Sequence, residues 1–194
     1  MPTFADLAAR IHATAPRLGA VRLVAVDGPS GAGKSSFAGR LAQAANAPVV
    51  HTDDLLNGWE DQFTFWTRLE EQVLGPLRQG CSGRYQRYLW HRGAFGGVPV
   101  FVDAAPVVLL EGSSSARSVI RPELSYSIFL DAPADVGWRR VVARDGGDDV
   151  AFQQYLERWH AAEQEHFAAD QTAAFVDLLV DGAARSFGEE YEEL

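Results

Sequence analysis

One segment restricts the folds open to this chain more than any other: Gly28-Pro29-Ser30-Gly31-Ala32-Gly33-Lys34-Ser35. It fits the pattern G-x-x-x-x-G-K-[ST], in which a glycine-rich turn joins a strand to a helix. Both flanks agree with the pattern, because residues 21–26 form a β-branched-rich run and residues 34–45 carry apolar side chains at helical spacing. The sequence therefore predicts a buried strand, a glycine-rich turn and a helix, in that order.

The residue types in this motif suit a polyphosphate ligand. Its glycines allow backbone conformations that place N–H groups against phosphate oxygens, and a helix beginning near Lys34 adds the positive end of its dipole. We expect Lys34 to reach the β- and γ-phosphates of ATP and the Ser35 hydroxyl to bind Mg²⁺. The residues predicted to bind the nucleotide are Gly28, Ser30, Gly31, Ala32, Gly33, Lys34, Ser35 and Ser36.

Strands and helices are predicted to alternate along the rest of the chain. Apolar runs typical of buried strands lie at residues 48–51, 107–110, 127–130 and 175–180. Amphipathic spacing typical of helices lies at residues 61–77, 134–144 and 152–167. This alternation predicts one α/β domain over residues 1–194, a three-layer α/β/α P-loop NTPase fold with a mostly parallel five-stranded sheet.

Composition argues against several classes of protein. A net charge of −9 argues against a nucleic-acid partner, since phosphate backbones bind broad basic surfaces. The apolar runs are too short to cross a bilayer, and the first residues do not resemble a signal peptide. The single cysteine, Cys81, leaves no internal disulfide and predicts a cytoplasmic location. Sixteen basic residues are arginine, and the one lysine is Lys34.

Acidic residues follow two of the predicted strands. Asp53 and Asp54 come after the strand at residues 48–51, and Glu111 follows the strand at residues 107–110. Because ligands of parallel sheets bind at the carboxyl ends of the strands, we expect these groups beside the glycine-rich turn. Asp53 or Asp54 is expected to deprotonate an acceptor hydroxyl, the alternative being a helix cap. Glu111 is expected to hold the water shell of Mg²⁺, the alternative being a salt bridge.

These motifs give the chain a resemblance to a known family. Residues 27–35, Thr52-Asp53-Asp54 and Glu111-Gly112 are similar to the uridine kinase-like group of P-loop kinases, which includes pantothenate kinase and phosphoribulokinase. The resemblance implies transfer of the γ-phosphoryl group of ATP, with Mg²⁺, to a hydroxyl of a nucleoside, vitamin or sugar-like acceptor. It also implies Asp53 rather than Asp54 as the base, because Asp53 aligns with the aspartate of the family's Asp-x-Phe-Tyr-like motif. Leu55-Leu56 stand where uridine kinases carry Phe-Tyr, which leaves the acceptor open.

The resemblance extends to a lid over the site and covers about residues 20–182. Residues 127–133 look like the strand that leads into the lid, and residues 139–145 look like its arginine-rich helix. By resemblance, Arg139 and Arg144 stabilise the charge of the transferring group, since guanidinium forks suit phosphate; the alternative is a solvated helix face. The lid is expected to be short, near residues 139–149.

The densest aromatic and basic segment, residues 84–92, is expected to be irregular or a short hairpin. Its rings offer stacking faces and its arginines offer forks, so with Trp59 and Trp66 it is a candidate wall for a planar or sugar-like acceptor. The alternative is that the rings fill the core. The residues predicted to bind the acceptor are Asp54, Tyr85, Arg87, Tyr88 and Trp90.

Two other functions stay open at this point. One is a regulatory ATPase that binds a nucleotide without an acceptor, and the other is a phosphotransferase for an antibiotic or an activated sugar. A kinase is favoured over the ATPase, because Asp53 and the lid arginines have no role in a simple switch. His160, Glu163 and His166 are spaced like metal ligands, but this spacing drifts around a helix, so a solvated helix face is predicted.

Overall fold

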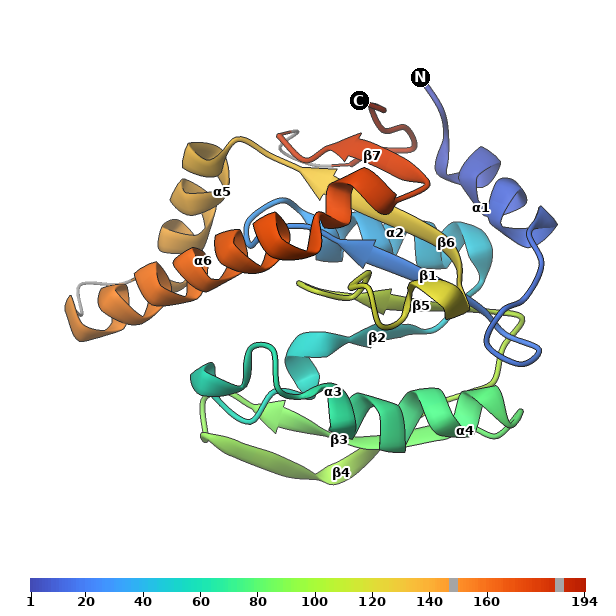
Figure 1. Ribbon diagram of the computed structural model, residues 1–194, viewed down its shortest axis with the longest axis horizontal. Helices are drawn as coiled ribbons and strands as arrows, with labels where there is room; N and C mark the ends of the chain where they lie inside the picture. Colours follow the sequence, from blue (N-terminus) through green and yellow to red (C-terminus); the bar gives the residue numbers. More distant parts are fainter. Residues whose placement is uncertain (147–149, 184–186) are drawn as a thin grey trace.

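The computed structural model describes residues 1–146, 150–183 and 187–194. At its centre lies a five-stranded sheet of order β2-β5-β1-β6-β7, in which all neighbouring strands are parallel (Figure 1). The strands are β1 (Arg22–Asp27), β2 (Val49–His51), β5 (Val107–Glu111), β6 (Leu124–Asp131) and β7 (Leu178–Asp181). The predicted five-stranded sheet is confirmed.

Helices α1 (Phe4–Ala13) and α2 (Lys34–Ala45) cover one face of the sheet (Figure 1). Side chains alternate along β1, so Val24 and Val26 pack with this helical layer. Leu23 and Ala25 pack in the core on the other face of the sheet. Helix α1 was not predicted. Its signal lay in a capping box, in which the side chain of Thr3 accepts the N–H of Asp6 and the carboxylate of Asp6 accepts the N–H of Thr3.

The opposite face carries a broken helix and a hairpin, which makes the third layer and confirms the predicted α/β/α architecture. The helix consists of α3 (Trp66–Leu69), the π-helical turn η3 (Glu70–Leu74) and α4 (Gly75–Arg78). It begins later than predicted: the 3₁₀ turn η2 (Trp59–Asp61) and turns at residues 62–65 precede it. Pro76 lacks an N–H and cannot donate to the preceding turn, which accounts for the break.

The hairpin consists of β3 (Gly83–Leu89) and β4 (Ala94–Val102), which pair in antiparallel fashion. Of the two alternatives for residues 84–92, the hairpin is therefore the right one, and it extends further than predicted. Figure 1 shows the hairpin at the far side of the molecule from the two chain ends. Its exposed side chains include Val98 and Phe101.

Two further helices lie beside the carboxyl ends of the strands. Helix α5 (Ala134–Val141) continues into the π-helical turn η5 (Val142–Gly146), and α6 (Val150–Asp170) is longer than predicted. The predicted lid near residues 139–149 falls on α5 and η5, except for residues 147–149, which lie outside the described residues. The short turns are η1 (Thr52–Asp54), η4 (Arg121–Glu123) and η6 (Thr172–Phe175). Turn η6 occupies the start of the strand predicted at residues 175–180.

Residues 187–194 run back along the molecule and join its first residues. Glu190 forms a β-bridge with Thr3, and Glu193 forms one with Val180 of β7. Phe187 packs edge-on against Phe37 of α2, with ring centroids 5.2 Å apart. Both chain ends therefore lie close together beside α1 (Figure 1). Within the described residues, no helix combines the length and the apolar character needed to cross a bilayer.

Candidate active site

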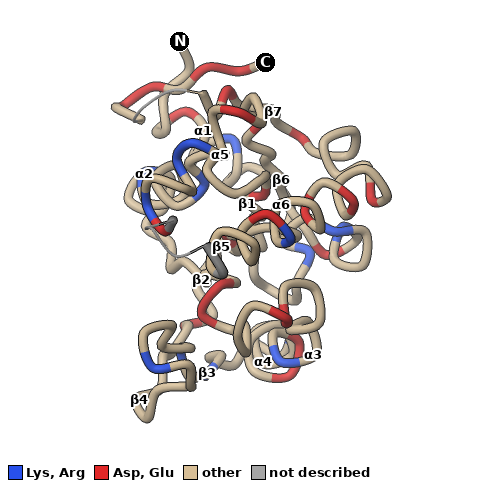
Figure 2. The backbone as a smooth tube through the Cα atoms, turned by 90° about the vertical axis from the view of Figure 1, so that its left-hand side faces the viewer, with Lys and Arg blue, Asp and Glu red and all other residues tan. Residues whose placement is uncertain are grey.

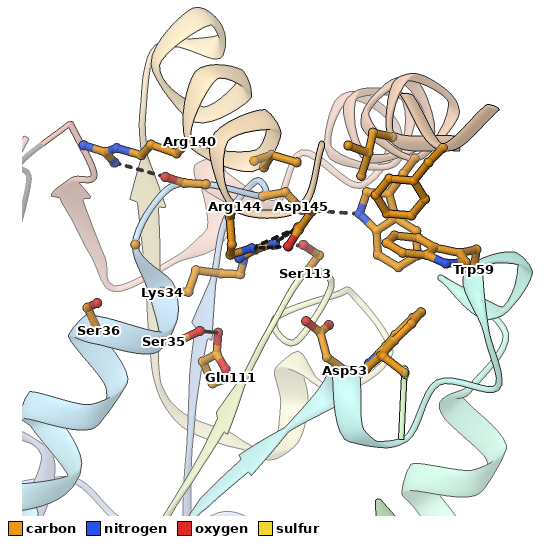
Figure 3. Close-up of a pocket in the computed structure, with 18 of the residues that line it drawn as sticks. Lys34, Ser35, Ser36, Asp53, Trp59, Glu111, Ser113, Arg140, Arg144 and Asp145 are labelled. Carbon is orange, nitrogen blue, oxygen red and sulfur yellow. Dashed lines mark hydrogen bonds and ion pairs between the residues drawn. The ribbon is translucent and has the colours of Figure 1, made fainter. Parts of the chain in front are cut away.

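A pocket of about 680 Å³ lies at the carboxyl edge of the sheet, between the glycine-rich loop and helices α5 and α6 (Figure 3). Its position follows from strand register, because His51 and Glu111 are paired at the ends of β2 and β5. Of the residues predicted to bind the nucleotide, those that line the pocket are Ser30, Gly31, Gly33, Lys34, Ser35 and Ser36. Gly28 and Ala32 do not line the pocket, although both belong to the loop.

The loop takes a path that only glycine permits at two points. Gly28 has a φ of 140°, and a Cβ there would lie 2.4 Å from the carbonyl oxygen of Leu130. Gly31 has a φ of 81°, and its Cβ would lie 2.2 Å from the carbonyl oxygen of Gly137 on α5. Glycine at these positions lets the loop pack directly on β6 and α5. The loop ends at Gly33, which caps α2 without a side-chain hydrogen bond to the helix N–H groups.

Lys34 and Ser35 lie at the start of α2 and point into the pocket (Figure 3). The Nζ of Lys34 donates to the carbonyl oxygen of Pro29 at 3.0 Å and to the Oγ of Ser113 at 3.4 Å. The hydroxyl of Ser35 donates to Oε1 of Glu111 at 3.1 Å. Lysine, serine and glutamate thus meet at the edge of the sheet, as the sequence predicted.

Glu111 is held by a second partner. Its Oε2 lies 2.5 Å from Nδ1 of His51, the last residue of β2. Burial alone would raise the pKa of Glu111, but the bond to His51 and the charge of Lys34 outweigh it, so the pKa is lowered. The same bond raises the pKa of His51. Glu111 is therefore an ionised oxygen donor beside the Ser35 hydroxyl.

These oxygen donors suit Mg²⁺. Serine and carboxylate oxygens are ligands that Mg²⁺ prefers, and this ion keeps several waters rather than filling its shell from protein. Within residues 1–146, 150–183 and 187–194, no three His, Cys, Asp or Glu side chains converge as a complete metal cage. Ser35 and Glu111 fit a partial site that water and phosphate oxygens would complete.

Asp53 and Asp54 are adjacent residues of the turn η1, and their side chains have different surroundings. Asp53 lines the pocket opposite Glu111, whereas Asp54 accepts the hydroxyl of Tyr85 at 3.2 Å and pairs with Nε of Arg87 at 2.9 Å (Figure 3). Solvent reaches Asp53 through the mouth of the pocket, but the protein around it removes much of its hydration. This desolvation, together with repulsion from Glu111, raises the pKa of Asp53 to about 6. Of the two aspartates, Asp53 is the one that lines the pocket.

Asp27 has a structural role that the sequence did not reveal. It ends β1 and is fully buried. Its carboxylate accepts the N–H groups of Gly28 at 2.7 Å, Ser114 at 2.9 Å and Ala116 at 2.8 Å. Burial raises its pKa to about 6, although these hydrogen bonds oppose the shift. Asp27 therefore ties the glycine-rich loop to the segment that follows β5.

The arginines of the predicted lid point in three directions. Arg139 is largely exposed, pairs with Asp135 on the same helix face and lies outside the pocket lining, so the structure does not bring it to the site. Arg140, one residue on, lines the pocket and donates to the carbonyl oxygens of Gly31 at 3.0 Å and Gly182 at 2.7 Å. Arg144 lines the pocket and pairs with Asp145 at 2.6 Å. Figure 2 shows basic segments of α2 and α5 near one another.

The aromatic wall of the pocket differs from the one predicted. Tyr85 and Tyr88 are buried residues of the hairpin strand β3, and Arg87 of the same strand pairs with Asp54. None of the three lines the pocket. Trp90 does. The other members of the wall come from η2 and α6: Trp59, Phe152, Leu156 and Trp159. The ring of Trp59 lies 4.8 Å from Trp90, 5.3 Å from Phe152 and 5.4 Å from Trp159.

Glu163 corrects one prediction. A solvated helix face was expected for His160, Glu163 and His166, but Glu163 has 0% of its surface exposed. It accepts the N–H of Ser30 at 3.1 Å and the hydroxyl of Ser30 at 2.7 Å, and it binds Ser113 at 2.5 Å. His160 instead contacts Trp138, and His166 stacks on Phe63. Helical spacing alone could not show that this face meets the glycine-rich loop.

Phe187 is a second pocket residue that the sequence did not reveal. It lines the pocket and is 6% exposed. Its Cε2 lies so near Gly33 that a Cβ there would be 3.2 Å away. The ring therefore borders the cavity on the side of α2, away from Trp59.

A glycine-rich loop with Lys34 and Ser35, at the carboxyl edge of a parallel sheet covered on both faces, defines the fold as that of a P-loop NTPase. No family model matches the chain. The uridine kinase of Schizosaccharomyces pombe is 26% identical over 184 residues, which cover 82% of this chain and 40% of that protein. The chain thus spans less than half the length of this curated relative.

Among solved structures, a possible uridine kinase from Bacillus stearothermophilus is similar to this chain with a TM-score of 0.66 and 18% identity. The match covers 91% of this chain and 96% of that chain. The predicted resemblance to the uridine kinase-like group of P-loop kinases is therefore confirmed, in sequence and in fold.

Proposed function

We propose that this chain is an ATP-dependent kinase that transfers the γ-phosphoryl group to a hydroxyl of a small molecule. One observation carries the proposal: Lys34, Ser35, Glu111 and Asp53 line a single pocket at the carboxyl edge of the sheet. A P-loop protein that only switches between nucleotide states needs no carboxylate base in its phosphate pocket. The names of its sequence and structural relatives support the same class of reaction.

Each side chain has a defined role in this reaction. Lys34 and the loop N–H groups bind the phosphates and stabilise charge on the group in transfer. Asp53 accepts the proton of the acceptor hydroxyl, whose oxygen then forms a bond to the γ-phosphorus. The bond from that phosphorus to the bridging oxygen breaks, which leaves ADP. Arg144 lines the same pocket, and its guanidinium would supply a cation for the transferring phosphoryl group.

A magnesium ion held by Ser35 and, through water, by Glu111 would neutralise charge on the phosphate oxygens. The chain's own contribution is to hold the two carboxylate oxygens of Glu111 in place. His51 fixes one oxygen of Glu111, and the Ser35 hydroxyl binds the other. A cytoplasmic location, with its supply of Mg·ATP, fits this requirement.

The acceptor side of the pocket supports a small molecule with a flat or apolar part. Trp59, Trp90 and Trp159 offer ring faces and edges there, and Asp53 stands at their border. Rings of this kind stack on planar groups and on the apolar faces of sugars. A nucleoside, a ring-containing vitamin or a sugar-like molecule meets this description. An acceptor that carries an antibiotic or activated-sugar scaffold would use the same chemistry.

The proposal is tested first by calorimetry and then by a screen. Titration with Mg·ATP should give a saturable binding heat in the wild-type protein. ADP release should then be measured with panels of nucleosides, vitamins and sugars. An acceptor that accelerates ADP release at least about tenfold over water would establish the kinase. ATP binding with hydrolysis that no acceptor accelerates would instead support the regulatory ATPase.

A further inference from the structure

Glu163 is a buried carboxylate whose partners are all in the loops of the candidate active site. It lies on α6, and its two oxygens accept hydrogen bonds from the backbone and hydroxyl of Ser30 and from the hydroxyl of Ser113. None of the ion pairs found among the described residues includes Glu163. A buried carboxylate with neutral partners is costly when any of these bonds is lost. The contact therefore holds α6 and the two loops together.

The hydrogen bonds continue on both sides of Glu163. On one side, Lys34 Nζ donates to Ser113 Oγ, and the Ser113 hydroxyl donates to Glu163. On the other side, Nε1 of Trp159 donates to Ser30 Oγ at 3.3 Å, and the Ser30 hydroxyl donates to Glu163. The Ser30 hydroxyl thus accepts one bond and donates one. The Ser113 hydroxyl accepts from Lys34 and lies within donating distance of both Glu163, at 2.5 Å, and the carbonyl oxygen of Gly28, at 3.3 Å. A continuous chain leads from the lysine of the phosphate loop to an indole of α6.

The same part of α6 also forms the aromatic wall. Trp159 packs on Trp59, and its carbonyl oxygen accepts Nε2 of Gln62 at 3.2 Å. Trp59 in turn contacts Trp90 at the end of the hairpin. One turn of α6 therefore contacts the phosphate loop with Glu163 and the acceptor wall with Trp159.

We propose that Glu163 is a positioning residue that couples the phosphate loop to the acceptor wall through α6. When Lys34 leaves Ser113 for phosphate oxygens, the donors around Glu163 change, and phosphates that order the loop also order the helix bonded to it. Coupling of this kind is reciprocal, so an acceptor against Trp159 favours the loop conformation that binds ATP. The inference rests on the proposed function, since it needs a nucleotide in the loop.

The substitution Glu163→Gln separates this role from simple packing. Glutamine keeps the shape of the side chain, but its amide has one acceptor oxygen and presents an NH₂ group to the donors of Ser30 and Ser113. The matched control is Glu165→Gln, which removes the same charge from an exposed position on the same helix. A second variant, Ser30→Ala, removes the hydroxyl and leaves the helix sequence unchanged.

The measurement is amide hydrogen exchange of residues 155–167, with and without Mg·ADP or a non-hydrolysable Mg·ATP analogue at saturation shown by calorimetry. In the wild type and in Glu165→Gln, nucleotide should slow exchange of this segment about fivefold. In Glu163→Gln and Ser30→Ala the slowing should fall below about twofold, although nucleotide still binds.

A purely structural role of Glu163 predicts another result. The exchange rate of α6 would then rise equally with and without nucleotide, and the ratio of the two rates would stay at the wild-type value. A wild-type ratio in Glu163→Gln overturns the inference. If this variant does not fold, a wild-type ratio in Ser30→Ala overturns it. Nucleotide binding by the wild type with no change in α6 also overturns the inference alone, whereas no binding at all removes the proposed function as well.

Discussion

The phosphate half and the acceptor half of the pocket are built in different ways. On the phosphate side, a contiguous loop wraps in a path fixed by glycines, and buried carboxylates such as Asp27, Glu111 and Glu163 hold it with short hydrogen bonds. On the acceptor side, Trp59, Trp90 and Trp159 come from three separate segments and meet through ring contacts. Trp90 is still 38% exposed.

This contrast follows from what each half is proposed to bind. A polyphosphate presents the same oxygens in every protein, so backbone N–H groups and one lysine suffice. An acceptor is recognised by shape, which side chains supply and which loops and hairpins can vary without disturbing the sheet. Changes on the phosphate side should therefore abolish transfer, while changes on the acceptor side should alter which molecule is used.

The largest effect is expected for Lys34→Ala. Loss of the single lysine at the phosphates should lower kcat/KM by about 10⁴-fold, in the range found for other cations that stabilise a transferring phosphoryl group. The thermal midpoint should also fall at pH 7, because the charge of Lys34 stabilises the ionised carboxylates of Asp27, Asp53 and Glu111. Steady-state kinetics and a melting curve check both statements. Retained transfer in this variant would remove the proposed mechanism.

Asp53→Asn should come next, with a fall in kcat of about 10²–10³-fold, because the acceptor hydroxyl loses its base. The wild-type kcat/KM should rise with pH through about 6 and then level off, since the pKa of Asp53 is about 6 and only the ionised form accepts a proton. Asp54→Asn is the comparison variant. A larger loss in Asp54→Asn would move the base to the hairpin side.

Arg144→Ala should lower kcat about 10–100-fold through loss of a cation at the pocket. Arg139→Ala is its matched control, because the two side chains are about equally exposed and each pairs with an aspartate. Arg139 lies outside the pocket lining, so this variant should stay within about twofold of the wild type. Equal losses in the two variants would contradict the orientation of α5.

Trp59→Ala should raise the KM of the acceptor about tenfold and leave the KM of ATP within about twofold, since it removes one side of the aromatic wall. Arg87→Ala and Tyr88→Ala should have smaller effects, because neither side chain lines the pocket. If Arg87→Ala equals Trp59→Ala, the acceptor binds under the hairpin, as the sequence first suggested.

The smallest effect concerns stability. The pKa of Asp53 is raised, so the folded protein binds this proton more tightly than the unfolded chain, and stability falls as pH rises from about 4 to about 6. At pH 7 the ionised side chain is a net cost. Asp53→Asn should therefore raise Tm by about 2 °C at pH 7 and leave it unchanged at pH 4. Differential scanning calorimetry at both pH values decides the sign.

The same contrast explains which parts of the fold and of the pocket could be predicted from the sequence. The phosphate loop could be predicted because its residues are contiguous and flanked by a strand and a helix of clear periodicity. Asp53 and Glu111 followed, since a parallel sheet brings the ends of its strands together. The five strands could be predicted because each is a short apolar run. Helix α1 depends on a local capping box, and the break before Pro76 depends on a missing N–H, so neither was predicted.

The remaining pocket residues could not be placed from the sequence, because each depends on a contact between segments that lie far apart in the chain. Arg139 and Arg140 differ by one position, but one residue turns a helix by about 100°, so only the second reaches the loop. Tyr85 and Arg87 lie two apart on a strand, yet the bulge after Gln86 shifts the register, and Tyr85 turns inward while Arg87 faces solvent. Glu163 and Trp159 lie more than 120 residues after Ser30 and meet it only through the fold.

Because Phe187 lines the pocket, the pocket is complete only after residue 187 has been synthesised. The ring borders the cavity beside Gly33 but is made more than 150 residues later, and a bridge from Glu190 to Thr3 then joins the last segment to the first. A ribosome-bound chain that has released only the sheet would carry the phosphate loop with one wall missing. Nucleotide would then gain its contact with Phe187 only after residues 187–194 had docked.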